Sequence, residues 1–172
     1  MLVNNAGIMQ RENLLTDPVD LTTAEATVAT NLLGPLRLTA ALLPHLLGQL
    51  QATVMTVSSG LAFVPIAMAP TYCATKAAIH SWSQTLRYQL RNTNVEVLEL
   101  APPYVQTELL GPGQKTDPRA MPLDAFIAEV MTILETKPDA TEILVERVKP
   151  QRFAESNGEY NQLLKTRNEA MP

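Results

Sequence analysis

Short apolar runs alternate with longer amphipathic stretches along the chain, which predicts strands and helices in turn. Four strands are expected, at residues 1–3, 53–58, 95–100 and 142–145. In the first long stretch between them, apolar residues recur at spacings of three and four, as the buried face of an amphipathic helix requires. Helices are expected at residues 22–47, 71–91 and 123–136. Because strands that alternate with helices pair through right-handed crossovers, the predicted fold class is α/β with a parallel sheet.

The connections between these elements also have recognisable patterns. Thr22 and Glu25 have the spacing of a capping box, which marks the start of the first helix. Residues 107–122 contain Gly-Pro-Gly and Asp-Pro and predict a flexible loop or lid. The last 22 residues are polar and predict a surface helix that frays. We therefore divide the chain into one main domain, residues 1–150, and a polar C-terminal tail of the same domain, residues 151–172.

The composition excludes several classes of function. The 172 residues are 46% hydrophobic and 17% charged, enough for one compact domain with a core. A net charge of −4 leaves no cationic surface for nucleic acid or anionic lipid. Two prolines, an arginine and a histidine interrupt the apolar stretch 32–50, which argues against a membrane span, and no secretory signal is visible. We expect a cytoplasmic protein, and one cysteine with two histidines predicts no metal site.

Glycine is scarce, and its positions exclude one kind of nucleotide-binding loop. The seven glycines stand at positions 7, 34, 48, 60, 111, 113 and 158. No three of them have the spacing G-x-G-x-x-G or G-x-x-x-G-x-G. The sequence therefore contains no glycine-rich loop of these two kinds to hold a pyrophosphate.

Tyr72 and Lys76 are four residues apart, so a helix places both on one face. A fixed cation near a phenol stabilises the phenolate, and it lowers the tyrosine pKa from about 10 toward the range of a general acid. The alternative is a half-buried core tyrosine beside a solvated lysine. The pair alone does not separate these two interpretations.

Ser59 follows the second predicted strand, at the sheet edge where ligands bind in open α/β folds. Its hydroxyl could donate a hydrogen bond to a substrate carbonyl oxygen that the Tyr72 phenol protonates. Alternatively, Ser59 only ends the strand and caps a loop.

Asn31 precedes Pro35 by four residues. Because proline has no N–H, a helix here kinks and leaves the Asn31 carbonyl without its helical donor. A water bound to that carbonyl could relay protons between Lys76 and solvent. Alternatively, Pro35 only marks the boundary between two helices.

Residues 4–7, Asn-Asn-Ala-Gly, end the first predicted strand with small or amide-bearing side chains. Such residues let a nucleotide approach the backbone closely, although the same tetrapeptide also forms ordinary turns. His45, His80, Trp82 and the methionines have no companions that indicate a site, and we assign them to packing.

The order and spacing of these motifs resemble the short-chain dehydrogenase/reductase family. The matching motifs are Asn4-Asn5-Ala6-Gly7, Asn31, Ser59, Tyr72-x-x-x-Lys76 and Pro102-Pro103-Tyr104-Val105-Gln106-Thr107. The resemblance is detailed to about residue 110 and looser beyond it. Residues 101–109 and 152–155 resemble one subgroup, oxidoreductases associated with D-alanine esterification of teichoic acid.

The resemblance implies a Rossmann-type, doubly wound fold and NAD(P)-dependent hydride transfer between a carbonyl and an alcohol. It assigns general acid/base catalysis to Tyr72. Lys76 would lower the Tyr72 pKa and hold the nicotinamide ribose. Ser59 would orient the carbonyl, and Asn31 would anchor the relay water.

The resemblance also implies which residues contact the cofactor. Asn5, Ala6 and Gly7 would lie along its adenosine half. Val105 and Thr107 would hold the carboxamide of the nicotinamide. The family usually has Pro-Gly at residues 102–103, where this chain has Pro-Pro, a feature that the named subgroup shares.

The sequence departs from the family at its front. Family members begin with a strand and a T-G-x-x-x-G-x-G loop that binds the pyrophosphate, and their Asn-Asn-Ala-Gly follows roughly 80 residues of chain. Here this motif starts at position 4. We therefore expect an N-terminally truncated sheet that lacks the first three strands and the glycine-rich loop. Weak or no binding of NAD or NADP is expected, with the choice between them undetermined.

Two functions remain open at this stage. The first is the catalytic part of a carbonyl or alcohol oxidoreductase that acts on a small molecule; the apolar residues at 61–68 and 109–122 favour a hydrophobic substrate. The second is a non-catalytic interaction or oligomerisation module derived from such an enzyme. In both, the long helices around residues 24–47 and 71–91 could pair with copies of themselves, which predicts a dimer or another homo-oligomer.

Overall fold

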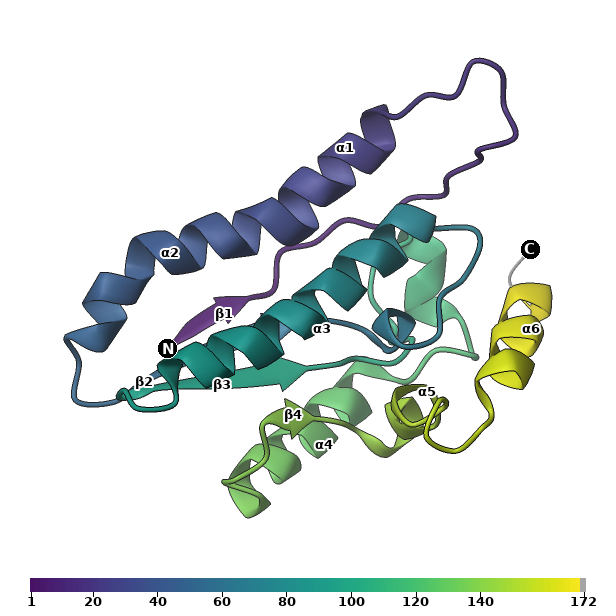
Figure 1. Cartoon of the computed structure of the whole chain (residues 1–172). Coiled ribbons are helices and arrows are strands. Elements are labelled where there is room, and N and C mark those ends of the chain that lie inside the picture. Colours follow the sequence, from purple (N-terminus) through teal and green to yellow (C-terminus); the bar gives the residue numbers. More distant parts are fainter. Residues whose placement is uncertain (171–172) are drawn as a thin grey trace.

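A computed structural model describes residues 1–170 and contains one four-stranded parallel sheet (Figure 1). The strands are β1 (Leu2–Asn4), β2 (Ala52–Val57), β3 (Val95–Leu100) and β4 (Glu142–Ile143), and they lie side by side in this order. Each pairs in parallel with the next, as Val54 with Leu2 on one side and with Val97 on the other. The predicted α/β class and parallel sheet are confirmed.

Helices connect the strands at the predicted places: α1 (Thr22–Val28), α2 (Gly34–Leu47), α3 (Pro70–Leu90) and α4 (Leu123–Thr136). Helices α5 (Lys149–Arg152) and α6 (Tyr160–Ala170) follow β4. Short 3-10 turns lie at Gly60–Ala62, Pro112–Thr116 and Glu146–Val148. Pro70 opens α3, where its missing N–H has no helical partner to lose and its fixed φ suits the first turn.

The sheet separates two hydrophobic cores. Residues of α2, α3, β2 and β3 form one core: Leu46, Ala52, Val54, Leu86, Leu90, Val95 and Val97. Residues of α4 and the chain around β4 form the other: Val105, Met121, Phe126, Val130, Ile133, Ile143, Val145 and Val148. β3 contributes to both, because successive side chains of a strand face opposite sides of the sheet: Val97 packs in the first core and Leu100 against the second.

A π turn, Ala29–Leu33, separates α1 from α2. It confirms the expectation that the helix is irregular next to Pro35, since the missing N–H there removes one α-helical bond. The predicted capping box is wrong. Thr22 is the first helical residue rather than the cap, and its N–H donates to Asp20 Oδ1 at 2.8 Å.

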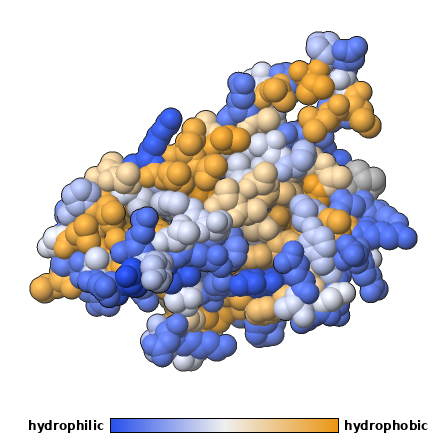
Figure 2. Space-filling view, in the orientation of Figure 1, coloured by the Kyte–Doolittle hydropathy of each residue, from blue (hydrophilic) through white to orange (hydrophobic). Residues whose placement is uncertain are grey.

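The buried side of this helix differs from the predicted one. The apolar residues whose spacing of three and four predicted the buried face are Val28, Leu32, Leu36, Leu43 and Leu47. The first four are half-buried and the last is exposed. The fully buried positions are instead Thr27, Asn31, Pro35, Thr39 and Leu46. Small and hydrogen-bonding residues replace the leucines here; the Asn4 side-chain amide, for example, donates to Thr39 Oγ1 at 2.9 Å. Apolar atoms are consequently left on the surface over α2 (Figure 2).

Among the described residues, one helical segment, Thr22–Leu47, is long and apolar enough to cross a membrane by length and composition alone, with a mean hydropathy of 1.2. Core helices of soluble proteins pass the same test, and this segment packs against α3 and β2. The expectation that it does not span a membrane stays a prediction.

The C-terminal part is more closely attached than a surface tail. Gln151 and Ala154 are buried, and α5 begins two residues before the predicted boundary at residue 151. The division into residues 1–150 and 151–172 therefore stays a prediction, and residues 171–172 lie outside the described part. The expected lid, residues 107–122, is also partly ordered, with a 3-10 turn and a buried Gln114.

Candidate active site

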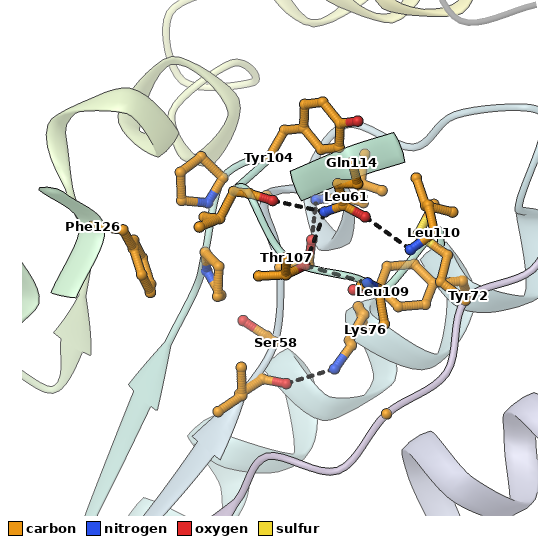
Figure 3. A pocket seen from close by; sticks show the side chains of 18 of the residues that line it. Ser58, Leu61, Tyr72, Lys76, Tyr104, Thr107, Leu109, Leu110, Gln114 and Phe126 are labelled. Atoms are coloured by element: carbon orange, nitrogen blue, oxygen red, sulfur yellow. Dashed lines mark hydrogen bonds between the residues drawn. The ribbon is translucent and has the colours of Figure 1, made fainter. Parts of the chain in front are cut away.

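The carboxyl ends of β1, β2 and β3 open into one cavity of about 650 Å³ (Figure 3). Its lining includes eight of the nine predicted site residues: Asn5, Ala6, Gly7, Ser59, Tyr72, Lys76, Val105 and Thr107. The ninth, Asn31, lies immediately behind Gly7, where a Cβ built on the glycine would be 3.4 Å from Asn31 Oδ1. Residues from five separate segments of the sequence therefore meet at one sheet edge, as ligand sites of open α/β folds do.

Helix α3 carries Tyr72 and Lys76, one turn apart, and both side chains are buried. The Lys76 ammonium donates to the carbonyl of Val57, the last residue of β2, at 2.7 Å. The same Nζ lies 5.5 Å from the centre of the Tyr72 ring. The lysine is thus held between the end of β2 and the tyrosine.

Burial dominates the acid–base properties of this pair. It raises the pKa of Tyr72 to about 12, partly offset by a hydrogen bond with Ser59. It lowers the pKa of Lys76 to about 8. The net pKa of Tyr72 is therefore raised, because desolvation disfavours the charged form of both groups and outweighs the other influences on the phenol. The expected lowering of the Tyr72 pKa by Lys76 stays a prediction.

Ser59 is placed by the turn that follows β2. It caps the 3-10 turn Gly60–Ala62, and its Oγ accepts a hydrogen bond from the Leu61 N–H at 3.1 Å. Ser59 thus has the capping role considered from the sequence, and it also lines the cavity beside Tyr72. Because the Oγ accepts from Leu61, its own proton remains available for a second partner.

Asn31 lies in the π turn, and its side chain fastens the segment that follows β1. Its Oδ1 accepts from the Ile8 N–H at 2.8 Å, and its Nδ2 donates to the Ile8 carbonyl at 2.8 Å. A longer contact of 3.4 Å joins Nδ2 to Thr75 Oγ1 on α3. Sequence reasoning considered only the main-chain carbonyl of Asn31 and missed this positioning role of the amide.

Val105 and Thr107 are bridged by a side chain that sequence reasoning also missed. Gln114 Nε2 donates to the Val105 carbonyl at 2.7 Å and to Thr107 Oγ1 at 3.0 Å. Its Oε1 accepts from the Leu110 N–H at 2.8 Å, and Figure 3 shows these three bonds together. The Gln114 carboxamide therefore bonds to Val105 and Thr107, the two residues that the resemblance assigns to the nicotinamide carboxamide.

Comparison with known proteins shows which family the chain is related to. The family described as short chain dehydrogenase matches residues 1–118. An uncharacterised oxidoreductase, DltE, of Bacillus subtilis (strain 168) is 41% identical over 172 residues, which are 98% of this chain and 67% of that protein. The chain belongs to the short-chain dehydrogenase family. Both the predicted family and the predicted subgroup are confirmed.

Solved structures of the family show the same fold. A short-chain dehydrogenase from Burkholderia cenocepacia J2315, in complex with NADP, matches with a TM-score of 0.78 and 22% identity over 95% of this chain and 69% of that one. One from Sphingobium yanoikuyae, in complex with NADPH, matches with a TM-score of 0.73 and 24% identity over 95% and 64%. The Rossmann-type fold is confirmed. The chain spans only 33–47% of the length of several other curated relatives.

Gly7 leaves space beside Lys76 in the cavity. Besides its contact with Asn31, a Cβ on Gly7 would lie 3.7 Å from Lys76 Nζ, so the glycine keeps the space beside the ammonium free. That ammonium has three protons, of which one goes to Val57. The remaining donors face a cavity that is long enough to include both the Asn5–Gly7 segment and Thr107.

A second polar cluster lies beside the cavity, between β3 and α3. Glu99 is only 1% exposed, and it accepts a hydrogen bond from Ser58 Oγ at 2.5 Å. His80 Nδ1 lies 2.8 Å from Glu99 Oε2. His80 was assigned to packing from the sequence, which is wrong, because it binds this buried carboxylate. The alternation of Val95, Val97 and Glu99 along β3 could have shown that the glutamate faces inward.

Glu142 extends this cluster and is held by Arg152, whose Nε donates to Oε2 at 2.6 Å. His80, Glu99 and Glu142 offer ligand atoms within 4.8 Å of one another, a spacing that can suit a metal ion. In this structure each of the two carboxylates already has a cationic or hydrogen-bonding partner.

Proposed function

We propose that this chain carries out the acid–base half of an NAD(P)-dependent carbonyl–alcohol interconversion, with Tyr72 as the general acid/base. The observation that carries the proposal is the convergence of Ser59, Tyr72 and Lys76 in one cavity that also includes Asn5–Gly7 and Thr107. A phenol, a hydroxyl and an ammonium around one space can bind and protonate a carbonyl oxygen.

In carbonyl reduction, Tyr72 donates its proton to the substrate oxygen. With a pKa of about 12, the phenol is protonated at neutral pH and ready to act as an acid. Ser59 donates a second hydrogen bond to the same oxygen and orients it. A bound nicotinamide cofactor would supply the hydride. In the reverse reaction, alcohol oxidation, the deprotonated phenol accepts the proton.

Lys76 is proposed to hold the nicotinamide ribose with the two protons that Val57 does not use. Its charge would stabilise the phenolate left after proton transfer. Asn31 fixes the segment after β1 through Ile8, and its main-chain carbonyl is proposed to hold the water that returns a proton to the site.

Cofactor binding is proposed to be weak for two reasons. The sequence contains no glycine-rich loop of the kinds considered above for the pyrophosphate. In addition, Gln114 donates to the Val105 carbonyl and the Thr107 hydroxyl, so a nicotinamide carboxamide that bound there would compete with it for these acceptors.

The proposal is tested by comparing Tyr72→Phe with the unchanged protein and with Tyr88→Phe, a control at an exposed tyrosine of the same helix. Binding of NADPH and NADH is followed by nucleotide fluorescence, and reduction of a series of apolar ketones by loss of absorbance. Removing the acid is expected to lower kcat by about 100-fold or more without changing cofactor binding. Equal rates for Tyr72→Phe and the unchanged protein would contradict the assignment.

The alternative, an interaction or oligomerisation module, rests on the exposed leucines of α2. Leu38 is 46% exposed and Leu42 37% exposed, and they lie one turn apart. Sedimentation of the unchanged protein and of the double variant Leu38→Glu and Leu42→Glu separates the functions. An oligomer that this variant dissociates, with no ketone reduction by either protein, would favour the module.

A further inference from the structure

Helix α6 is fastened over the rim of the cavity. Asn168 Nδ2 donates to the Pro65 carbonyl at 3.2 Å, and its Oδ1 accepts from the Ala67 N–H. Residues 65–67 follow the turn that Ser59 caps, so these bonds hold α6 beside the segment that brings Ser59 and Ile66 to the cavity. Figure 1 shows α6 at the end of the molecule toward which the strands point.

Arg167, the neighbour of Asn168 on α6, lines the same cavity as Tyr72. Its Nε is buried, and among the described residues it has no hydrogen-bond partner. Burial lowers the pKa of the guanidinium from its ordinary value, but an arginine stays protonated in proteins. A half-buried positive charge without an anion is unfavourable, so a bound anion would recover the lost hydration.

The nearby carboxylates of the described residues are already engaged elsewhere. Glu108, the acidic residue of the cavity lining, accepts from Lys115 Nζ at 2.7 Å. Glu12 accepts from the Thr71 N–H at 3.2 Å and from its hydroxyl at 2.6 Å. The structure therefore pairs both acids in this region with other donors than Arg167.

Much of the remaining lining of the cavity is apolar. It includes Leu61, Ile66, Leu109, Leu110, Phe126 and Ile127. A ligand that fits has an apolar body, a carbonyl at Tyr72 and one anionic group at the guanidinium. A single planar fork matches a carboxylate, which it can bind through two parallel hydrogen bonds.

We propose that Arg167 binds a substrate carboxylate, and that the substrate is an apolar oxo acid or the corresponding hydroxy acid. The inference rests on the proposed function for the carbonyl chemistry, whereas carboxylate recognition by Arg167 is separable from it. Arg167 would thus be a specificity-determining residue, contributed by the last helix of the chain.

Direct binding tests the recognition step without any turnover. Isothermal titration calorimetry compares octanoate with octanamide, which has the same apolar body and no charge. The unchanged protein is expected to bind octanoate about tenfold or more tightly than octanamide, the scale of one charge-assisted hydrogen-bond pair. Arg167→Met should abolish this preference, and Arg167→Lys should keep part of it. Lys165→Met, at an exposed lysine of α6, is the control and should keep all of it.

Equal affinities of the unchanged protein for octanoate and octanamide, no octanoate binding, or a preference that survives Arg167→Met would each overturn the inference. Circular dichroism verifies that the variants fold. Reduction of 4-oxodecanoate and of its methyl ester then distinguishes the two proposals. If the ester is reduced as well as the acid, the oxidoreductase function stands and the carboxylate inference fails. If neither is reduced although octanoate binds through Arg167, the function fails and the recognition of carboxylates stands.

Discussion

Ser58 and Ser59 follow one another after β2 and both line the cavity, yet their hydroxyls bond to groups in two regions with opposite electrostatics. Ser58 faces the cluster between β3 and α3, where the buried Glu99 has Ser58 and His80 as partners. Ser59 faces the cavity, where Lys76 has one protein acceptor and the Nε of Arg167 has none among the described residues.

The comparison separates structural polar groups from those available to ligands. Buried polar groups in folded proteins are normally satisfied, because an unpaired one loses its hydration without compensation. The Glu99 cluster follows this rule within the chain. The cavity does not, and its incompletely partnered cations are the groups that we assign to ligands. Substitutions in the first region should therefore affect mainly stability, and those in the second mainly binding and pH dependence.

The largest loss of stability is expected for substitution of Glu99, the buried carboxylate of the first region. Glu99→Ala leaves the Ser58 hydroxyl and the His80 ring without their buried acceptor, so the free energy of unfolding should fall by about 2–4 kcal/mol. Urea denaturation measures it. Glu96→Ala, at an exposed glutamate of the same strand, is the control and should change little. A Glu99→Ala protein as stable as the control would show that the cluster contributes nothing to the fold.

The dependence of stability on pH tests the second region, the cavity with its incompletely partnered cations. Lys76 has a pKa of about 8 in the fold against 10.5 for an exposed lysine, so the unfolded chain binds more protons between these values. Lys76 should therefore raise stability against urea from pH 8 to pH 10, by roughly 2 kcal/mol, and the buried Cys73 thiol, whose pKa is raised by burial, should offset part of this rise. Above pH 10 the effect of Tyr72 opposes it, because the folded phenol keeps its proton up to about pH 12.

Lys76→Met should remove this rise, and Lys115→Met, at an exposed lysine, should keep it. A rise that persists in Lys76→Met would mean that another group releases its proton on folding. Such a result would mean that Lys76 is a structural polar group like those around Glu99, and it would weaken the proposal that Lys76 holds the cofactor.

The sequence predicted the elements more reliably than the surroundings of their side chains. The strand over Val95–Leu100 and the helix over Leu123–Thr136 lie where expected, because their apolar runs end at clear turn signals. The prediction of which side of α1 and α2 is buried was wrong. Small polar residues such as Thr39 occupy that side in place of the leucines, because they find hydrogen-bonding partners there. The spacing of hydrophobic residues along the sequence does not predict which polar residues will find such partners.

The candidate site shows the same limit. Tyr72, Ser59 and Lys76 were found because their spacing in the chain is itself a motif. Gln114 and Arg167 have no such spacing, and only the folded backbone brings them to the cavity. The direction of the Tyr72 pKa was also missed, because it depends on how much water the fold excludes, and a nearby cation in the sequence does not reveal that.

The smallest effect is expected for Gln114. This side chain lines the cavity, but its amide is hydrogen-bonded within the chain. Its three hydrogen bonds order residues 105–110, so Gln114→Ala should lower the free energy of unfolding by about 1 kcal/mol. The same substitution frees the Val105 carbonyl and the Thr107 hydroxyl for a nicotinamide carboxamide. Affinity for dihydronicotinamide mononucleotide and for NADPH, measured by fluorescence, should then increase about threefold.

Gln106→Ala is the matched control, since that amide bonds the Asp117 carbonyl instead and should leave both affinities unchanged. Weaker nucleotide binding by Gln114→Ala would mean that Gln114 positions the loop for the cofactor rather than competing with it. Opposite signs for stability and affinity in one substitution are what a competing side chain requires. A side chain that only supports the fold would lower both.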